Sequence, residues 1–200
     1  MPSENTTRTA AEISAEPAVR DSLRLILDEL SAAADGLRED QLAALAAEIR
    51  QAERVFVAGG GRSGLALRMH AMRLMHLGLT VYVVGETTTP AIGSGDLLVV
   101  ASGSGTTAGA VAAAQSAVSA GARVVALTTD GGSTLAETAH RVVVIPAAQK
   151  TDHSGTASRQ YSGSLFEQAL LLVLDAVFAA LWKSDGTPAE DLWPRHANLE

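Results

Sequence analysis

Five short apolar segments, separated by longer segments with helical periodicity, constrain the fold of this 200-residue chain most strongly. The apolar segments are residues 55–58, 80–84, 96–102, 123–129 and 141–146. Short strands that alternate with helices predict parallel βαβ units, because parallel neighbours need a crossover connection and the helices then cover both faces of the sheet. We therefore predict an α/β fold, with a doubly wound parallel five-stranded sheet sandwiched by helices.

The segments before and after this alternation predict the domain organisation. Residues 1–15 are polar and have no sustained period, which predicts a flexible leader. Leucine and isoleucine then recur at helical spacing in residues 18–33 and 42–49, and one long helix is expected from Gly163 to about Trp182, followed by an irregular tail. We predict that residues 16–200 form a single domain.

Composition excludes several classes of function. A formal net charge of -7 argues against nucleic acid as a partner, because its binding needs a basic face. No cysteine is present, so thiol chemistry is excluded and the composition suits a reducing cytoplasm. The longest apolar run, residues 169–174, is stopped by Asp175 well short of a membrane span. We expect a soluble cytoplasmic protein without a membrane partner.

The first predicted strand is followed by a glycine-rich loop. Gly59, Gly61 and Gly64 match the G-x-G-x-x-G pattern of dinucleotide-binding proteins, and Glu86 lies about where that pattern places an acid for the ribose. The pattern is weak evidence alone, because any phosphate held at a strand-to-helix turn needs similar backbone. Glu86 is also typical of a solvated loop carboxylate. A nicotinamide site therefore stays an alternative, whereas a P-loop is excluded because no Gly-Lys-Ser/Thr occurs.

A second loop, residues 102–107, is richer in hydroxyl groups. Its sequence Ser-Gly-Ser-Gly-Thr-Thr follows the strand at 96–102 and opens a helix, so hydroxyls and free backbone N–H groups converge there. Ligands of open α/β sheets bind at the carboxyl ends of strands. We predict that both loops form a cradle for one phosphate, held by Ser63, Ser102, Ser104 and Thr107. The alternative is that these hydroxyls only cap helices.

Four stretches carry a resemblance to a known family. They are GRSG at 61–64, MRLMHLGLTVYVVGETTTPAI at 72–92, GSLFEQALL at 163–171 and RHANLE at 195–200. With the two glycine loops, they resemble the sugar isomerase (SIS) domain family of phosphosugar-binding proteins, and within it the 6-phospho-3-hexuloisomerase branch. The resemblance covers roughly residues 20–200 and implies an SIS-type, flavodoxin-like topology.

The resemblance implies an activity and its setting. The implied reaction interconverts 3-hexulose 6-phosphate and fructose 6-phosphate in ribulose monophosphate formaldehyde fixation, with 3-hexulose-6-phosphate synthase as a functional partner and a homotetramer as the assembly. Moving a carbonyl between adjacent carbons requires a base and a group that steadies the enediolate oxygen, and no metal or redox cofactor. Related loops often read S-G-S-G-E-T, whereas Thr106 stands here in place of the acid.

The substrate-binding residues expected from both loops are Gly61, Arg62, Ser63, Ser102, Gly103, Ser104, Thr106 and Thr107. Arg62 could contact substrate oxygens or pair with an acid across an interface. Three alternatives remain: an SIS isomerase for a different sugar phosphate, a non-catalytic sugar-phosphate sensor that uses the same cradle, and the nicotinamide oxidoreductase. Apolar surface on the helices exceeds what one small sheet covers, which predicts a homo-oligomer.

Two further residues have catalytic roles by resemblance. Glu167 is expected to be the proton-abstracting base; from spacing alone, Ser164-x-x-Glu167 also fits a capping box. His196, in the isomerase-like tail, is the candidate acid, proton shuttle or ring-opening residue, although a histidine near a chain end is often simply solvated. His70 and His76 are expected to be surface or packing residues, and His153 lies in a polar loop that could approach the site.

Overall fold

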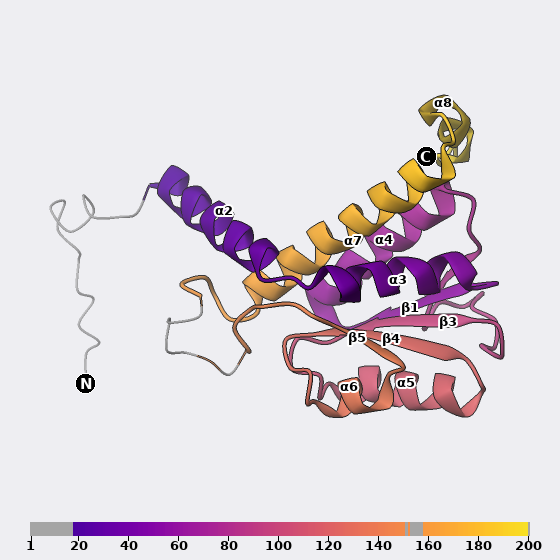
Figure 1. Ribbon diagram of the computed structural model, residues 1–200, viewed down its shortest axis with the longest axis horizontal. Helices are drawn as coiled ribbons and strands as arrows, with labels where there is room; N and C mark the ends of the chain where they lie inside the picture. The colour runs from indigo at the N-terminus through magenta and orange to yellow at the C-terminus, as the bar shows by residue number, and fades with distance from the viewer. Residues whose placement is uncertain (1–17, 151, 153–157, 200) are drawn as a thin grey trace, which may run out of the picture.

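The computed structural model describes residues 18–150, 152 and 158–199, and contains one parallel five-stranded sheet (Figure 1). The predicted leader, 1–15, lies outside the described residues. The strands are β1 (Val55–Gly59), β2 (Val81–Val83), β3 (Leu97–Ala101), β4 (Arg123–Thr128) and β5 (Arg141–Val144), in the order β2-β1-β3-β4-β5. The predicted sheet is confirmed, with each strand inside or within one residue of its predicted segment.

This strand order determines where a ligand site can form. β1 pairs with both β2 and β3, in parallel register from Val55 opposite Val81 and Leu97. The chain therefore proceeds outward in one direction from β1 and in the other direction from β3. In such a sheet the loops after these two strands diverge and leave a crevice at their carboxyl ends. Both hydroxyl-rich loops predicted from the sequence follow these two strands.

Helices cover both faces of the sheet (Figure 1). They are α2 (Val19–Asp35), α3 (Glu39–Gln51), α4 (Gly61–His76), α5 (Ala108–Ser119), α6 (Thr134–Thr138), α7 (Ser164–Asp185) and α8 (Ala189–Leu192), followed by the 3-10 helix η1 (Trp193–Arg195). α5 and α6 lie on one face, whereas α3 and α4 lie on the other, with α7 packed along α4. The tail predicted to be irregular thus contains two short helical turns, which begin around Pro188 and Pro194.

Alternating side chains of the strands build two separate cores. In β3, Leu97 and Val99 point into the core beneath α3, α4 and α7, while Leu98 and Val100 point into the core beneath α5. All five residues of β3 are buried. A strand buried on both faces is expected to be apolar throughout rather than alternating, which is why the sequence shows a continuous apolar run here.

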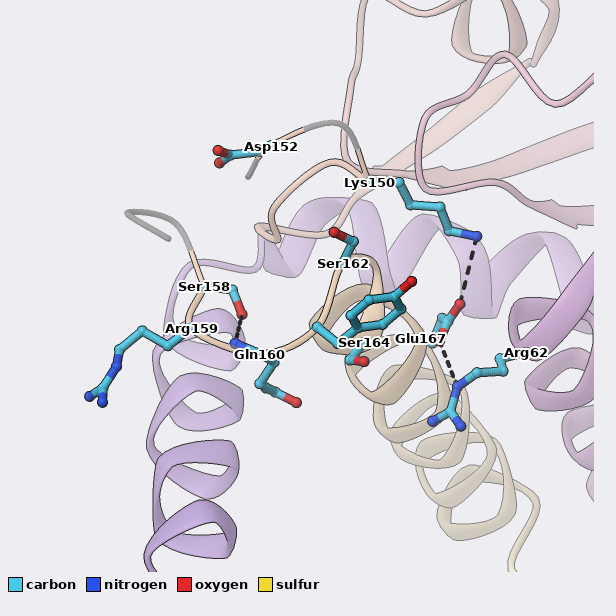
Figure 2. A pocket seen from close by; sticks show the side chains of 10 residues that line it. Arg62, Lys150, Asp152, Ser158, Arg159, Gln160, Ser162, Ser164 and Glu167 are labelled. Carbon is cyan, nitrogen blue, oxygen red and sulfur yellow. Dashed lines mark hydrogen bonds and ion pairs between the residues drawn. The ribbon is translucent and has the colours of Figure 1, made fainter. Parts of the chain in front are cut away.

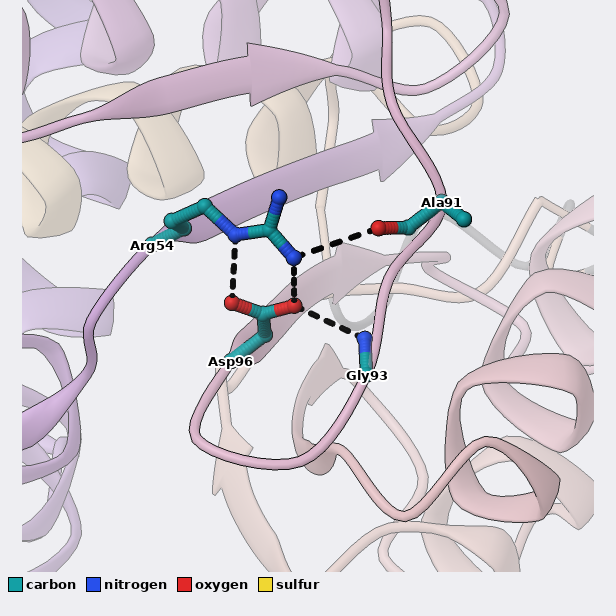
Figure 3. A network of polar contacts seen from close by, with 4 residues as sticks. All are labelled: Arg54, Ala91, Gly93 and Asp96. Atoms are coloured by element: carbon teal, nitrogen blue, oxygen red, sulfur yellow. Dashed lines mark hydrogen bonds and ion pairs between the residues drawn. The ribbon is translucent and has the colours of Figure 1, made fainter.

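A partly buried ion pair ties the amino ends of β1 and β3 together (Figure 3). Arg54 donates two hydrogen bonds to Asp96, from Nε to Oδ1 at 2.8 Å and from Nη2 to Oδ2 at 2.6 Å, and Gly93 N–H donates to Oδ2 at 2.7 Å. The hydrogen bonds from Arg54 lower the pKa of Asp96, although burial opposes them. The pair anchors the sheet at the edge opposite the glycine loops.

α7 is the central helix of the larger core. By length and composition it could cross a membrane, but half of its apolar stretch is buried inside the protein. Leu170 and Leu174 are fully buried, and α4 packs along the helix. This burial is what the core helix of a soluble protein requires, and it explains why so apolar a segment occurs within a small α/β domain.

Candidate active site

The loops after β1 and β3 enclose a cavity of about 260 Å³ at the carboxyl edge of the sheet. Its lining consists of Gly60, Gly61, Ser63, Ala101, Ser102, Gly103, Ser104, Thr107 and Lys150. α4 and α5 begin at this cavity, and the first N–H groups of a helix have no partner inside it. The structure thus brings hydroxyls of both loops to these two helix N-termini, and we call this cavity the phosphate cradle, after the role predicted for it.

The first loop is shaped by a close contact between two glycines. A Cβ on Gly64 would lie 2.4 Å from the carbonyl oxygen of Gly59. The start of α4 can therefore lie this close to the end of β1 only because residue 64 has no side chain. Gly61, with φ +55°, begins α4 immediately after Gly60. The side chain of Ser63 is buried in the first turn of α4 and lines the cradle.

The second loop presents its hydroxyls to the cradle rather than to a helix end. Thr107 occupies the N-cap position of α5, but its side chain makes no capping hydrogen bond. Instead its Oγ1 lies 2.8 Å from Oγ of the buried Ser102. Ser104 Oγ accepts hydrogen bonds from the backbone N–H and hydroxyl of Thr106 at 3.3 and 3.0 Å. The alternative in which these residues serve only as side-chain caps is therefore wrong.

The loop after β4 holds the second loop in place. Gly105, with φ +64°, lies so close to Ser133 that an added Cβ would be 1.9 Å from its Oγ. Gly103 carbonyl oxygen accepts from Thr129 N–H at 3.0 Å and from Thr129 Oγ1 at 2.8 Å. These contacts hold the backbone of residues 103–105, and the positive φ and the close approach to Ser133 explain why glycine occupies position 105.

A larger cavity of about 760 Å³ lies beside the cradle, at the N-terminus of α7 (Figure 2). It is lined by Arg62, Lys150, Asp152, Ser158, Arg159, Gln160, Tyr161, Ser162, Ser164 and Glu167. Lys150 lines both cavities. Together the two cavities offer a small polar end and a wider end, as a phosphorylated sugar would need.

Glu167 is the buried carboxylate among the residues that line this cavity. Its side chain is 9% exposed, and Arg62 Nε donates to its Oε2 at 2.6 Å, while Lys150 Nζ lies 3.9 Å from its Oε1 (Figure 2). α7 begins at Ser164 with Gly163 as its N-cap, and no side chain caps it. The capping-box interpretation is therefore wrong. Arg62 was expected to contact substrate oxygens or to pair with an acid across an interface; the structure instead pairs it with an acid of its own chain.

The polar loop after Pro146 was expected to be able to approach the site, but Lys150 was not singled out by sequence reasoning. Lys150 is one of only two lysines in the chain, and it stands in the polar stretch after Pro146. Ser158 and Arg159 lie in the same segment between β5 and α7 and are held to α2 by Glu29. The Glu29 carboxylate accepts hydrogen bonds from Ser158 Oγ at 2.6 Å and from Arg159 N–H at 2.7 Å. Burial raises the pKa of Glu29, but these hydrogen bonds outweigh it and leave the pKa lowered.

Several predicted residues lie outside the two cavities. Thr106 is exposed and does not line the cradle; it contacts Ser104 instead. His196 stacks on His76, with ring centroids 4.0 Å apart, at the C-terminal end of α4. Arg62 and Glu167 lie at the opposite end of α4, so His196 is not brought to the site of its own chain. His153 lies outside the described residues.

Glu86 and His70, which could have served a dinucleotide or a metal ion, have the surroundings of structural residues. Glu86 is half exposed and forms an ion pair with Arg68 at 2.5 Å, as expected for a solvated loop carboxylate. Within residues 18–150, 152 and 158–199, no group of three His, Asp or Glu side chains could hold a metal ion. His70 is fully buried, and burial lowers its pKa to about 4, so it is a neutral packing residue as expected.

Known proteins resemble this chain over most of its length. A protein of Mycobacterium gastri named 3-hexulose-6-phosphate isomerase is 59% identical, over 91% of this chain and 92% of its own. One of the same name from Bacillus subtilis is 39% identical, over 88% and 95%. A solved structure from Methanococcus jannaschii, whose description infers the function of 3-hexulose-6-phosphate isomerase, superposes with a TM-score of 0.77 at 30% identity, over 90% and 99%.

The family model described as the SIS domain matches residues 48–172, from the end of α3 to the middle of α7. This range contains both loops of the phosphate cradle, Lys150 and Glu167. The fold and the relatives agree with the resemblance found in the sequence. The chain belongs to the SIS domain family.

Proposed function

We propose that this protein interconverts 3-hexulose 6-phosphate and fructose 6-phosphate through an enediolate. The observation that carries this proposal is the position of Glu167, a buried carboxylate immediately beside a cradle of hydroxyls at two helix N-termini. Such N-termini favour a phosphate, and a carboxylate within reach of the sugar carbons is what enolisation requires. The names of the relatives from M. gastri and B. subtilis support the same reaction.

The reaction follows from this arrangement. Glu167 removes the proton on C3 of fructose 6-phosphate, and the electron pair of that C–H bond forms the C2–C3 double bond while the C2 carbonyl becomes an enediolate oxygen. The proton of the C3 hydroxyl then moves to the C2 oxygen, and protonated Glu167 returns its proton to C2, which places the carbonyl at C3 and leaves a hydroxyl on C2. Arg62, beside Glu167, is the cation available to steady the developing negative charge. The cradle holds the phosphate fixed throughout.

Proton exchange tests the proposal directly. The protein is incubated with fructose 6-phosphate in deuterated water and the sugar is followed by NMR. Deuterium at C3, or the appearance of the 3-ulose, is the expected result. Deuterium at C1 would instead indicate an isomerase for an aldose–ketose pair, and binding without exchange would indicate a sugar-phosphate sensor. A titration in which NAD binds but fructose 6-phosphate does not would indicate the nicotinamide alternative.

The physiological setting is also a proposal. By resemblance the reaction is the second step of ribulose monophosphate formaldehyde fixation in the cytoplasm, and 3-hexulose-6-phosphate synthase supplies the substrate. A coupled assay tests this: purified synthase, ribulose 5-phosphate and formaldehyde should give fructose 6-phosphate only when this protein is added. Accumulation of the 3-ulose in its presence would contradict the proposal.

An exposed apolar stripe supports a homo-oligomer, which we propose to be a tetramer. Leu65, Met69 and Met72 follow one another on α4 at helical spacing and are 61%, 52% and 57% exposed. Leu23 and Leu27 form a second exposed pair on α2, which extends from the body of the domain (Figure 1). A contiguous exposed apolar face usually marks an interface.

A further inference from the structure

Lys150 lies where the phosphate cradle meets the larger cavity, and the fold makes room for it there. It lines both cavities. Its aliphatic stem crosses Gly163, because a Cβ on Gly163 would lie 2.9 Å from Lys150 Cε and 3.1 Å from Cγ. Gly163 has φ +84°, a conformation that glycine adopts without strain. The N-terminus of α7 therefore passes beneath the lysine without a side chain to obstruct it.

The cradle needs a positive charge that only Lys150 provides among the residues lining it. Apart from Lys150, that lining consists of glycine, alanine, serine and threonine. Hydroxyls and N–H groups can bind a phosphate dianion, but hydrogen bonds between ionised groups are roughly twice as strong as neutral ones. An ammonium on a flexible stem is suited to move toward such an anion.

In the structure this ammonium is paired with Glu167 instead. The two cations on Glu167 are not equivalent, since Arg62 Nε makes a 2.6 Å hydrogen bond, whereas Lys150 Nζ lies at 3.9 Å, beyond hydrogen-bond distance. The Lys150 side chain is 64% exposed, and ion pairs of such exposed groups contribute little. Exchanging this partner for a phosphate dianion therefore costs little and gains a stronger contact.

We propose that Lys150 changes partners during the reaction: it pairs with Glu167 in the free protein and with the substrate phosphate in the complex. The exchange removes a positive charge from Oε1 of Glu167, the oxygen then free to accept the carbon-bound proton. The phosphate, remote from the reacting carbons, thereby activates the base, which makes the enzyme selective for phosphorylated sugars. The link to catalysis rests on the proposed function, whereas the change of partners does not.

The small number of lysines makes the exchange directly observable. Lys150 and Lys183 are the only lysines, and Lys183 lies in the last turn of α7. Reductive methylation with ¹³C-formaldehyde keeps their charges and gives one NMR signal for each, which the Lys183→Met variant assigns. Titration with inorganic phosphate, at constant ionic strength set by chloride, should move the Lys150 signal saturably and leave the Lys183 signal unchanged.

A variant of the other partner completes the test. In Glu167→Gln, the Lys150 signal of the free protein should differ from that of the wild type, while the phosphate-saturated signals should coincide. A Lys150 signal that ignores phosphate, or that still depends on Glu167 at saturation, would overturn the proposal. If that result accompanied deuterium exchange into fructose 6-phosphate, the isomerase function would stand and only the change of partners would fail.

Binding strength gives an independent measurement. Inorganic phosphate should inhibit the isomerase reaction by occupying the cradle. In Lys150→Met its inhibition constant should rise about tenfold or more, the usual effect of losing one hydrogen bond to a charged group. Lys150→Arg should recover part of that loss, because it restores the charge. Lys183→Met is the matched control, and inorganic phosphate should inhibit it as strongly as it inhibits the wild type. Equal inhibition of Lys150→Met and wild type would show that Lys150 does not bind the phosphate.

Discussion

At the scale of single residues, Glu167 carries the proposed chemistry. Glu167→Gln keeps the size of the side chain and removes its basicity, so the variant should bind fructose 6-phosphate yet exchange deuterium at least about a hundredfold more slowly. Glu86→Gln, which changes an exposed carboxylate in a turn, is the matched control and should exchange normally. Near-normal exchange in a folded Glu167→Gln protein would mean that another group is the base.

His70 makes the stability of the protein depend on pH. Burial lowers its pKa from 6.5 to about 4, so the folded state resists a proton that the unfolded state accepts. The contribution of neutral His70 is therefore complete above pH 6.5 and lost as the pH falls toward 4, by up to about 3 kcal/mol. Urea unfolding at fixed protein concentration should show this decline.

The control variant replaces His70 by a side chain that does not titrate. His70→Gln keeps a polar side chain at the contact of α4 with α7, and its unfolding free energy should fall less steeply between pH 6.5 and 4. The comparison uses the slopes rather than the absolute stabilities, because the substitution also changes packing. Identical slopes in variant and wild type would assign the acid sensitivity to other groups.

At the scale of elements, the turn from β3 into α5 forms one wall of the cradle. Ser104→Ala removes a hydroxyl from this turn and should mainly weaken substrate binding, by one to two powers of ten, because a hydrogen bond to a charged group is worth roughly 1.5–3 kcal/mol. Ser63→Ala should act similarly from the first turn of α4. Isothermal titration with fructose 6-phosphate measures both.

A serine at the other end of the same helix provides the control for the cradle. Ser119 Oγ donates to Gln115 carbonyl oxygen at the C-terminal end of α5, away from the site. Ser119→Ala should therefore bind as the wild type does. Unchanged affinity in both Ser104→Ala and Ser63→Ala would reject the phosphate cradle, because no other pair of loops at this sheet edge offers the same hydroxyls among the described residues.

At the scale of the whole molecule, the stripe on α4 predicts how subunits associate. Met72→Glu places a charge in this apolar stripe, so it should dissociate the oligomer, because burying an unpaired charge is costly. Val118→Glu is the matched control: Val118 is an exposed apolar residue on α5, on the opposite face of the sheet. Sedimentation velocity distinguishes them, and an intact oligomer of Met72→Glu would place the interface elsewhere.

The position of His196 leads to a prediction about shared sites. His196 stacks on His76 at the end of α4, and a helix of 16 residues is about 24 Å long, so within one chain His196 is remote from Arg62 and Glu167. If His196 serves a neighbouring subunit, His196→Ala and Glu167→Gln should each be nearly inactive. Unfolding and refolding them together should restore activity, because some mixed sites contain both residues.

The outcome of this mixing experiment is decisive in either direction. Mixed oligomers that form, as measured by native mass spectrometry, and yet stay as inactive as their parents would show that His196 does not complete the site of a neighbouring subunit. Activity like that of the wild type in His196→Ala alone would show that His196 has no catalytic role. The stack with His76 would then be a contact that only fastens the tail to α4.

The sequence by itself determined the order of strands and helices, because the spacing of apolar residues reports directly which face of each element is buried. It also determined where the first glycine loop lies, since the steric need for glycine at Gly64 arises from its contact with Gly59 within one short turn. The resemblance then identified the family, which the family model and the relatives confirm.

Only the tertiary structure decided which charged groups meet. The contact of Arg62 with Glu167 joins residues 105 positions apart, and the position of Lys150 between two cavities depends on how the connection after β5 crosses the N-terminus of α7. The same holds for His196, which the fold carries to the far end of α4. Periodicity and spacing describe neighbours along the chain, whereas such distances arise from the packing of whole helices against the sheet.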